Sequence, residues 1–401
     1  MLLFMSLQLQ IEKLVYGGDG LSRLDGEVVL TPFVLPDETV DAERVEARKH
    51  VQRARLVRVE QPSPDRVEPA CPVFGRCGGC HYQHAAYDAQ LRFKRDILAE
   101  TLRRVGKIDF DAGQIGIESA KPFGYRNRAQ FHFERGRLGY REVNSRRLVA
   151  IEQCPISSPK INEILLKLSR MVRDRRWPGF VRSLEVFTDE RQVQWNVLES
   201  EQPVAKRFFD WVAEEVPGTV AGPLEYAVNE DLFQVSGTSF FQVNRFLLPR
   251  LAELAIGEAG GAVAWDLYAG AGLFSLPLAR TFERILAVEA GRSAGDLVHN
   301  ADRAHVHVEV AAEQTEVFLE KAKSAPDFVL ADPPRAGLGK AAAERLSQLR
   351  PPALVIVACD PATLARDLAA LQPVYEIERM IMVDLFPQTF HIETIVRLKL
   401  K

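Results

Sequence analysis

The sequence predicts an α/β protein with a doubly wound sheet in its C-terminal part, preceded by a small β-barrel and a central α+β domain. Three observations lead to this prediction. The chain has 401 residues, more than one ordinary domain holds. Residues 6–60 form short alternating runs of apolar and polar residues between glycines and prolines, as in small barrels. Beyond residue 240, apolar strands alternate with helices, which is typical of a doubly wound sheet.

Charge is distributed unevenly along the chain. Residues 1–150 contain 24 Lys and Arg against 20 Asp and Glu, whereas the remaining residues contain 27 against 34. A polyanionic partner should therefore meet the N-terminal part. The positive charge concentrates in two stretches: Arg44, Arg48, Lys49, Arg53, Arg55 and Arg58, then Arg126, Arg128, Arg135, Arg137, Arg141, Arg146 and Arg147. Arginine-rich stretches of this kind form solvent-exposed surface about as often as they contact phosphate groups.

No segment has the apolar length of a membrane span. Residues 1–10 are too short and lack the charged start of a secretory signal. We therefore expect a cytoplasmic protein that does not contact the membrane. Nothing in the sequence indicates an obligate protein partner.

The middle of the chain follows a proline-marked linker at residues 61–65. Apolar residues then recur at helical spacing among charged residues, which predicts an amphipathic helix over residues 87–105. Residues 123–227 have the pattern of strands and loops, with one helix near residues 160–173.

Four cysteines have the spacing of one metal site: Cys71, Cys77 and Cys80 lie close together, and Cys154 is remote. Four thiolates suit either zinc or a [4Fe–4S] cluster. Structural zinc sites usually have two Cys-x-x-Cys pairs, whereas this set divides three and one, with a proline after Cys71 and after Cys154 as in cluster-binding runs. We therefore favour an iron–sulfur cluster. Disulfides are not expected in a cytoplasmic chain of this size.

The C-terminal part contains four apolar strands, each ending near an acid or a thiol. We expect them at residues 262–267, 285–289, 328–332 and 354–359. Because a doubly wound sheet binds its ligands at the carboxyl ends of its strands, these polar residues should share one edge.

A glycine-spaced loop follows the first of these strands and contains Gly270 and Gly272. Glycines let a nucleotide approach the backbone, and Glu289, at the end of the next strand, can accept both ribose hydroxyls. The third glycine that a dinucleotide site would prefer is absent. The loop therefore favours a nucleoside without phosphates, such as S-adenosylmethionine.

Two further residues end strands. Asp332 precedes two prolines, which fix the backbone and remove two amide donors, so its carboxylate should face the cleft. Cys359 is the fifth cysteine, outside the predicted metal site. It is either a packed residue or a nucleophile, and a nucleophile needs an electropositive or polar setting. Glu393 is a candidate general base, and His391 is interpreted as structural.

Seven features carry a resemblance that extends over nearly the whole chain: the four cysteines, GGDGLSR (17–23), YRNRA (125–129), FFQVN (240–244), DPPRAG (332–337), CDPATLARD (359–367) and DLFPQTFHIE (384–393). Taken together, they make the chain resemble the S-adenosylmethionine-dependent RNA uracil-5-methyltransferases. Within that family, the chain looks like the 23S rRNA branch that has a TRAM barrel and a [4Fe–4S] cluster.

The resemblance implies three domains. An OB-like TRAM β-barrel that binds RNA would span residues 1–62. A central α+β domain with the iron–sulfur cluster would span residues 63–235, and its helix at 87–105 could pack on the catalytic domain. A Rossmann-like class I methyltransferase domain would span residues 236–401.

The resemblance also implies a covalent mechanism. Carbon 5 of uracil is a poor nucleophile, so Cys359 would first add to carbon 6, and Glu393 would later remove the proton from carbon 5. The positions that match the family's S-adenosyl-L-methionine site are Gln242, Tyr268, Glu289 and Asp332.

Several alternatives stay open at this point. The expected RNA is 23S rRNA, and the alternative is the T-loop of tRNA. An RNA cytosine-5-methyltransferase would also use a cysteine, whereas an amino-methyltransferase, which the acid-Pro-Pro motif suggests, would need none. In a non-catalytic RNA-binding protein, the cluster would serve only to stabilise the fold.

The chain departs from the family's pattern at three places. Asp360 replaces an asparagine, and an ionised carboxylate beside the thiol would disfavour the thiolate. Leu273 replaces a polar side chain after the glycine loop. The acid near the adenine aligns with either Ala312 or Glu313. Phe240 and Phe241 are candidates for stacking on bases, and we expect at least one of them to be buried.

Overall fold

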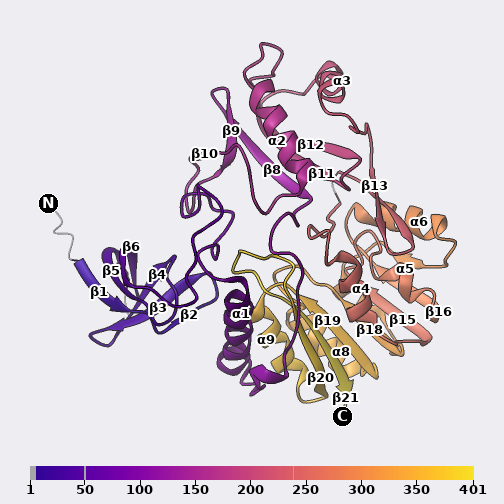
Figure 1. Cartoon of the computed structure of the whole chain (residues 1–401). Coiled ribbons are helices and arrows are strands. Elements are labelled where there is room, and N and C mark those ends of the chain that lie inside the picture. Colours follow the sequence, from indigo (N-terminus) through magenta and orange to yellow (C-terminus); the bar gives the residue numbers. More distant parts are fainter. Residues whose placement is uncertain (1–5, 49–50, 238) are drawn as a thin grey trace. The chain divides into compact units, whose positions relative to one another are not determined.

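The computed structural model describes residues 6–48, 51–237 and 239–401, without the side chains of residues 6, 47 and 48. Lys49 and the side chain of Arg48, both in the first basic stretch, lie outside this part. The chain forms two compact units (Figure 1). The first comprises Met1–Leu98, Tyr140–Val149 and Phe386–His391, and the second comprises Ala99–Gly139, Ala150–Leu385 and Ile392–Lys401. This division differs from the three predicted domains, whose boundaries stay a prediction.

Six strands near the N-terminus form one sheet in the order β1-β5-β6-β4-β3-β2. They are β1 (Ser6–Gln10), β2 (Lys13–Leu14), β3 (Asp19–Leu24), β4 (Glu27–Pro32), β5 (Thr39–Arg48) and β6 (Val51–Gln61). Side-chain alternation directs Leu9, Val29 and Val40 into one buried apolar cluster. Residues of β1 also approach β3, so the sheet curls back on itself. The predicted strands are present, and their assignment to a TRAM barrel stays a prediction.

A segment from the C-terminal part of the chain belongs to the first unit. Gln388 in this segment exchanges hydrogen bonds with Gln90: Gln90 Nε2 donates to Gln388 Oε1 at 3.0 Å, and the Gln388 backbone N–H donates to Gln90 Oε1 at 3.1 Å. The backbone N–H groups of His81 and Tyr82 donate to the Gln388 carbonyl oxygen at 2.8 and 3.0 Å. These bonds attach the segment Phe386–His391 to the cysteine-rich segment.

Helix α1 (Tyr87–Thr101) is shorter than the predicted helix at 87–105. Residues Leu102–Gly106 continue it as a π-helical turn, which packs on α9 (Pro361–Leu371). At this contact, a Cβ on Gly106 would lie 2.7 Å from the Ala365 carbonyl oxygen. The regular helix thus ends where the chain meets α9 at a distance that only glycine permits.

A five-stranded sheet in the order β10-β9-β8-β11-β12 occupies the middle of the chain. Its strands are β8 (Arg128–Glu134), β9 (Arg137–Arg141), β10 (Leu148–Ala150), β11 (Val181–Thr188) and β12 (Val193–Ser200), and its helices are α2 (Pro159–Met171) and α3 (Lys206–Glu215). The helix expected near 160–173 is therefore confirmed. It begins at the Ser158 N-cap and buries Ile161, Leu165 and Leu168.

An eight-stranded sheet dominates the second unit, in the order β17-β16-β15-β18-β19-β21-β20-β7. The strands are β7 (Gly116–Glu118), β15 (Gly261–Leu267), β16 (Phe282–Val288), β17 (Glu309–Ala311), β18 (Phe328–Ala331), β19 (Ala353–Ala358), β20 (Tyr375–Val383) and β21 (Glu393–Leu400). The first five strands in this order are parallel, and β21 is antiparallel to both neighbours. The hairpin β13 (Leu224–Val228) and β14 (Asp231–Val235) precedes this sheet.

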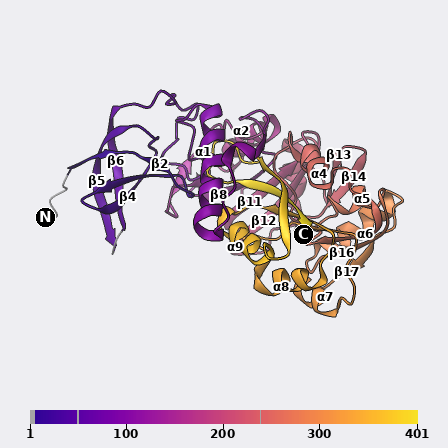
Figure 2. The ribbon, with the colours of Figure 1, turned by 90° about the horizontal axis from the view of Figure 1, so that it is seen from below.

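Helices cover both faces of this sheet (Figure 2). They are α4 (Leu248–Ile256), α5 (Ser275–Leu278), α6 (Ser293–Arg303), α7 (Thr315–Lys321), α8 (Gly339–Leu349) and α9. Helices α4 and α5 contact each other, and α7, α8 and α9 pack in succession. The predicted doubly wound sheet is therefore confirmed. Its strand order reverses between β15 and β18, which is where such sheets open a ligand crevice. No helix in the described ranges is long and apolar enough to cross a bilayer.

Candidate active site

Cys359 follows the buried strand β19 and is partly exposed. The next residue, Asp360, is the N-cap of α9: its Oδ1 accepts from the backbone N–H groups of Ala362 and Thr363, both at 2.9 Å. An aspartate at this position satisfies two N–H groups at the positive end of the helix dipole. Asp360 thus caps α9. Because asparagine and aspartate are both good N-caps, the residue that departs from the family's pattern can still fill this structural role.

The register of β19 and β21 brings Glu393 to the thiol. Ala358 lies opposite Thr394 in this antiparallel pair, so the next step of the register places Cys359 opposite Glu393. Glu393 is almost fully buried. Burial raises its pKa well above the ordinary value, Asp332 raises it further, and Arg335 opposes the shift.

The charges around Cys359 do not favour a thiolate in the absence of ligand. Burial raises the pKa of Cys359 to about 12, and the carboxylates of Glu393 and Asp332 contribute to the increase. Arg335 is the cation that lowers it. The structure thus brings together the three residues that the sequence places at strand ends, Cys359, Glu393 and Asp332, and it adds Arg335 to them.

Buried Asp266 and half-buried Asp332 lie at the ends of two neighbouring strands, β15 and β18. Asp332 continues β18, and its backbone N–H donates to the Leu267 carbonyl oxygen at 3.2 Å. Asp266, in β15, accepts from Ser275 Oγ at 2.5 Å. Burial raises the pKa of each to about 7, with Asp332 raised further by Asp266, and Asp266 further by Glu289. Asp266 ends an apolar strand in the sequence, which is the signal that could have identified it.

The glycine loop is held by Glu289. The backbone N–H groups of Gly270 and Gly291 donate to the two carboxylate oxygens of Glu289, at 2.9 and 2.6 Å. Tyr268 has a φ of 63°, a conformation rare for a side chain of this size and more common at functional sites. A Cβ on Gly272 would lie 2.5 Å from Leu297 Cδ1, so glycine is needed here for packing. The loop therefore presents its backbone beside a fixed carboxylate.

Helix α6 fixes the segment before Gln242 through two residues that the sequence did not single out. Asp296 accepts from Ser236 Oγ at 2.7 Å and from Ser239 Oγ at 2.5 Å. Asn300 Nδ2 donates to the Ala271 carbonyl oxygen at 2.9 Å, within the glycine loop. One helix therefore connects two predicted parts of the cofactor site.

The aromatic pair before Gln242 divides as expected. Phe241 is 3% exposed and packs among the rings of Phe233 and Tyr226, whereas Phe240 is 65% exposed. The prediction that at least one of the two is buried is confirmed. Of these two rings, only that of Phe240 is exposed enough to stack on a base.

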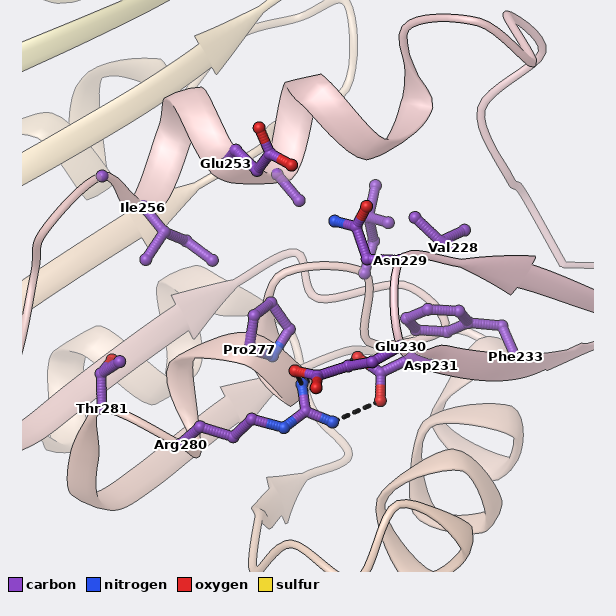
Figure 3. A pocket seen from close by; sticks show the side chains of 13 residues that line it. Val228, Asn229, Glu230, Asp231, Phe233, Glu253, Ile256, Pro277, Arg280 and Thr281 are labelled. Atoms are coloured by element: carbon purple, nitrogen blue, oxygen red, sulfur yellow. Dashed lines mark hydrogen bonds and ion pairs between the residues drawn. The ribbon is translucent and has the colours of Figure 1, made fainter.

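The structure contains a cavity of about 260 Å³ (Figure 3). It is lined by the β13–β14 turn, the end of α4 and residues near α5, and two of its lining residues, Arg280 and Asp231, form an ion pair. None of the predicted catalytic or cofactor residues lines it. Leu273 does line it and is buried, so its apolar side chain serves packing at this position.

The predicted metal site is not reproduced. In the part of the chain that the structure describes, no group of three or more His, Cys, Asp or Glu residues is arranged to hold a metal. Cys71, Cys77 and Cys80 belong to the first unit and Cys154 to the second. The sequence spacing that suggested the site does not fix the separation of these segments in space.

Comparisons with known proteins agree on the family. A family model described as tRNA (Uracil-5-)-methyltransferase matches residues 316–401, which contain Asp332, Cys359 and Glu393. An uncharacterized RNA methyltransferase of Aquifex aeolicus is 34% identical over 429 residues, covering 98% of this chain and 99% of the relative. One from Listeria monocytogenes is 31% identical, covering 98% and 97%.

A solved structure shares the fold. The tRNA (uracil-54, C5)-methyltransferase of Pyrococcus abyssi, in complex with S-adenosyl-L-homocysteine, has a TM-score of 0.79 and 24% identity, and the match covers 98% of this chain and 100% of that one. This likeness extends over both units and supports a methyltransferase fold. Because relatives that match nearly the whole chain are RNA methyltransferases, the chain belongs to the RNA methyltransferase family. The tRNA (uracil-5-)-methyltransferase model matches its C-terminal part.

Proposed function

We propose that the protein transfers a methyl group from S-adenosylmethionine to carbon 5 of a uridine in RNA. The observation that carries this proposal is the meeting of Cys359, Glu393 and Asp332 at one edge of the sheet, next to the glycine loop and Glu289. A thiol and a buried carboxylate at this edge fit addition to a pyrimidine ring followed by proton removal.

The proposed reaction uses Cys359 as a nucleophile. The thiolate bonds to carbon 6 of uracil, and the electrons of the double bond move toward carbon 5 and the carbon 4 carbonyl. Arg335 favours the thiolate, because it lowers the pKa of Cys359. When bound, S-adenosylmethionine would supply the electrophilic methyl group that carbon 5 takes up, and S-adenosylhomocysteine would be the leaving group.

Glu393 completes the cycle as general base. Its carboxylate accepts the proton of carbon 5, the double bond between carbons 5 and 6 forms again, and the bond from carbon 6 to sulfur breaks. The released thiolate is the one that attacked, so Cys359 undergoes no net change. The raised pKa of Glu393 makes its carboxylate a stronger base than an exposed one.

The proposed cofactor site consists of Gln242, Tyr268, Gly270, Gly272, Glu289 and Asp332. Glu289 would accept the ribose hydroxyls while its oxygens also hold the loop. The S-adenosyl-L-homocysteine bound to the Pyrococcus abyssi structure supports a cofactor of this class.

The test is methyl transfer from S-adenosylmethionine to matched RNA oligonucleotides that differ only in uracil or cytosine at one position. We expect 5-methyluridine in the uracil RNA and no product in the other. Transfer to cytosine alone would contradict the proposal. Full activity of Cys359→Ala would support an amino-methyltransferase instead.

We propose 23S rRNA as the substrate, on the basis of the predicted barrel and the four cysteines. The T-loop of tRNA is a second candidate, which the likeness to a tRNA (uracil-54, C5)-methyltransferase over 98% of the chain favours. Mapping 5-methyluridine in both RNAs from a strain that lacks the gene separates them. Loss from 23S rRNA supports the first candidate, and loss from tRNA alone supports the second.

We further propose, from sequence spacing, that Cys71, Cys77, Cys80 and Cys154 bind a [4Fe–4S] cluster. Asn162 orders the loop of Cys154: its Oδ1 accepts from the Cys154 N–H at 2.8 Å, and its Nδ2 donates to the Cys154 carbonyl oxygen at 3.0 Å. Metal and sulfide analysis of anaerobically purified protein tests this proposal. We expect iron and sulfide in the wild type and smaller amounts of both in Cys154→Ser. Zinc without iron would contradict the proposal.

A further inference from the structure

Four arginines of the first unit lie on two loops whose backbones are hydrogen-bonded to each other: Arg76, Arg141, Arg146 and Arg147, hereafter the arginine patch. Arg76, Arg146 and Arg147 are exposed. Within the residues that the structure describes, none of the four makes an ion pair with a carboxylate. Their positive charge is therefore not balanced by the protein at close range.

Backbone hydrogen bonds hold the two loops of the patch together. The N–H of Gly78 donates to the Arg141 carbonyl oxygen at 3.0 Å, and the N–H of Val143 donates to the Arg76 carbonyl oxygen at 3.0 Å. Arg141 Nη1 donates to the Arg146 carbonyl oxygen at 2.5 Å. The loops are thus fixed without any carboxylate partner, which leaves the exposed guanidinium groups to contact a ligand.

Three arginines of the first basic stretch differ from the patch, because each of them has an acid partner. Arg53 lies 3.2 Å from Asp19, and Arg58 lies 3.1 Å from Asp41. Arg55 pairs with Glu43. An incoming anion would have to compete with these carboxylates on the same sheet.

Two members of the second stretch are likewise committed to the fold. Arg128 is buried, with Nε 3.0 Å from Glu185 Oε1 and its guanidinium 4.7 Å from the centre of the Phe187 ring. Arg126 Nε donates to the Arg128 carbonyl oxygen at 2.8 Å. The basic stretches of the sequence therefore contain arginines with different roles.

We propose that the arginine patch binds backbone phosphates of the RNA substrate, an inference that rests on the proposed function. Arginine suits this ligand because its planar guanidinium donates two parallel hydrogen bonds to phosphate oxygens. The chain as a whole carries a net charge of -3, so general attraction to RNA is absent and a local positive surface is required. Residues 71–80 contain no acid, and residues 140–149 contain only Glu142.

The experiment compares Arg146→Ala/Arg147→Ala with the matched control Arg182→Ala/Arg284→Ala in the full-length protein. Both control arginines lie outside the basic stretches, and they pair with Glu201 and Glu309. The probe is a fluorescent RNA fragment that the wild type methylates, titrated at several salt concentrations. The patch variant should bind about tenfold more weakly. Its plot of log affinity against log salt should be shallower by about 1 to 2, since each lost phosphate contact removes roughly 0.7 to 0.9 from the slope. The control should bind within about twofold of the wild type, since its arginines already have acid partners.

Equal losses in the two variants, or wild-type affinity and slope in the patch variant, would overturn the inference. The binding of S-adenosyl-L-homocysteine and the melting temperature show whether each variant is folded, and neither should change. Failure of the proposed function can be distinguished from failure of this inference. In that case the wild type itself methylates no RNA, whereas failure of this inference alone leaves methylation intact and the patch variant binding like the wild type.

Discussion

At the scale of single residues, the site is a thiol surrounded mainly by carboxylates. Glu393 and Asp332 both raise the pKa of Cys359, and Arg335 acts in the opposite direction. Such an arrangement lowers the stability of the folded protein. It favours the proposed reaction, because a buried carboxylate with a raised pKa can accept a proton from carbon. Asp360, one of the three departures from the family's pattern, is the N-cap of α9.

Substitutions of Asp360 test its role as a cap. Asp360→Asn retains an oxygen that accepts from Ala362 and Thr363, so the free energy of unfolding should change little. Asp360→Ala leaves both N–H groups without this partner and should lower that free energy by about 1 kcal/mol. Urea unfolding of the two variants measures the difference, and equal free energies of unfolding in both would contradict a contribution of the accepting oxygen.

Asp332 should make the stability depend on pH. Burial raises its pKa from 3.8 to about 7, so the folded protein binds more protons than the unfolded chain between these values. Stability contributed by this group therefore falls as the pH rises from about 4 to about 7. Relative to the wild type, Asp332→Asn should gain unfolding free energy between pH 5 and pH 8. A constant difference across this range would rule out the raised pKa.

At the scale of elements, α6 connects the two segments expected to hold the cofactor. Asp296 and Asn300 lie on one buried face of this helix. Asp296 bonds to Ser236 and Ser239, and Asn300 bonds to the glycine loop. Sequence periodicity indicates that a helix is there and cannot say which loops its polar side chains reach. In the sequence alone, nothing distinguishes these two polar residues from exposed residues of a helix.

Asn300→Ala should weaken the binding of S-adenosyl-L-homocysteine. The substitution removes the bonds to Ala271 and Gln234 and leaves buried backbone groups unsatisfied, which typically costs about 1–3 kcal/mol. Part of this loss should appear as lower affinity in calorimetry, because the glycine loop loses its support. Asn162→Ala is the matched control, since Asn162 orders the Cys154 loop instead. The same loss of affinity in both variants would argue against a specific role of α6.

At the scale of the whole molecule, much of the second unit could be predicted from the sequence. The four apolar strands, the glycine loop and the acids at strand ends are local patterns, and a doubly wound sheet brings strand ends to one edge. The placement of β21 between β19 and β20, and of the short β7 at the end of the sheet, depends on long-range pairing that no local pattern encodes. The segment Phe386–His391 also belongs to the first unit although it directly precedes Ile392 and Glu393.

The central claim is that Cys359 attacks carbon 6 of a uracil, and RNA containing 5-fluorouridine tests it most directly. Fluorine replaces the proton that Glu393 would remove, so the protein should remain covalently bonded to the methylated RNA. Mass spectrometry after digestion should find the adduct on the peptide that contains Cys359, and Cys359→Ala should form none. An adduct on another residue, or methylation of normal RNA by Cys359→Ala, would contradict the account.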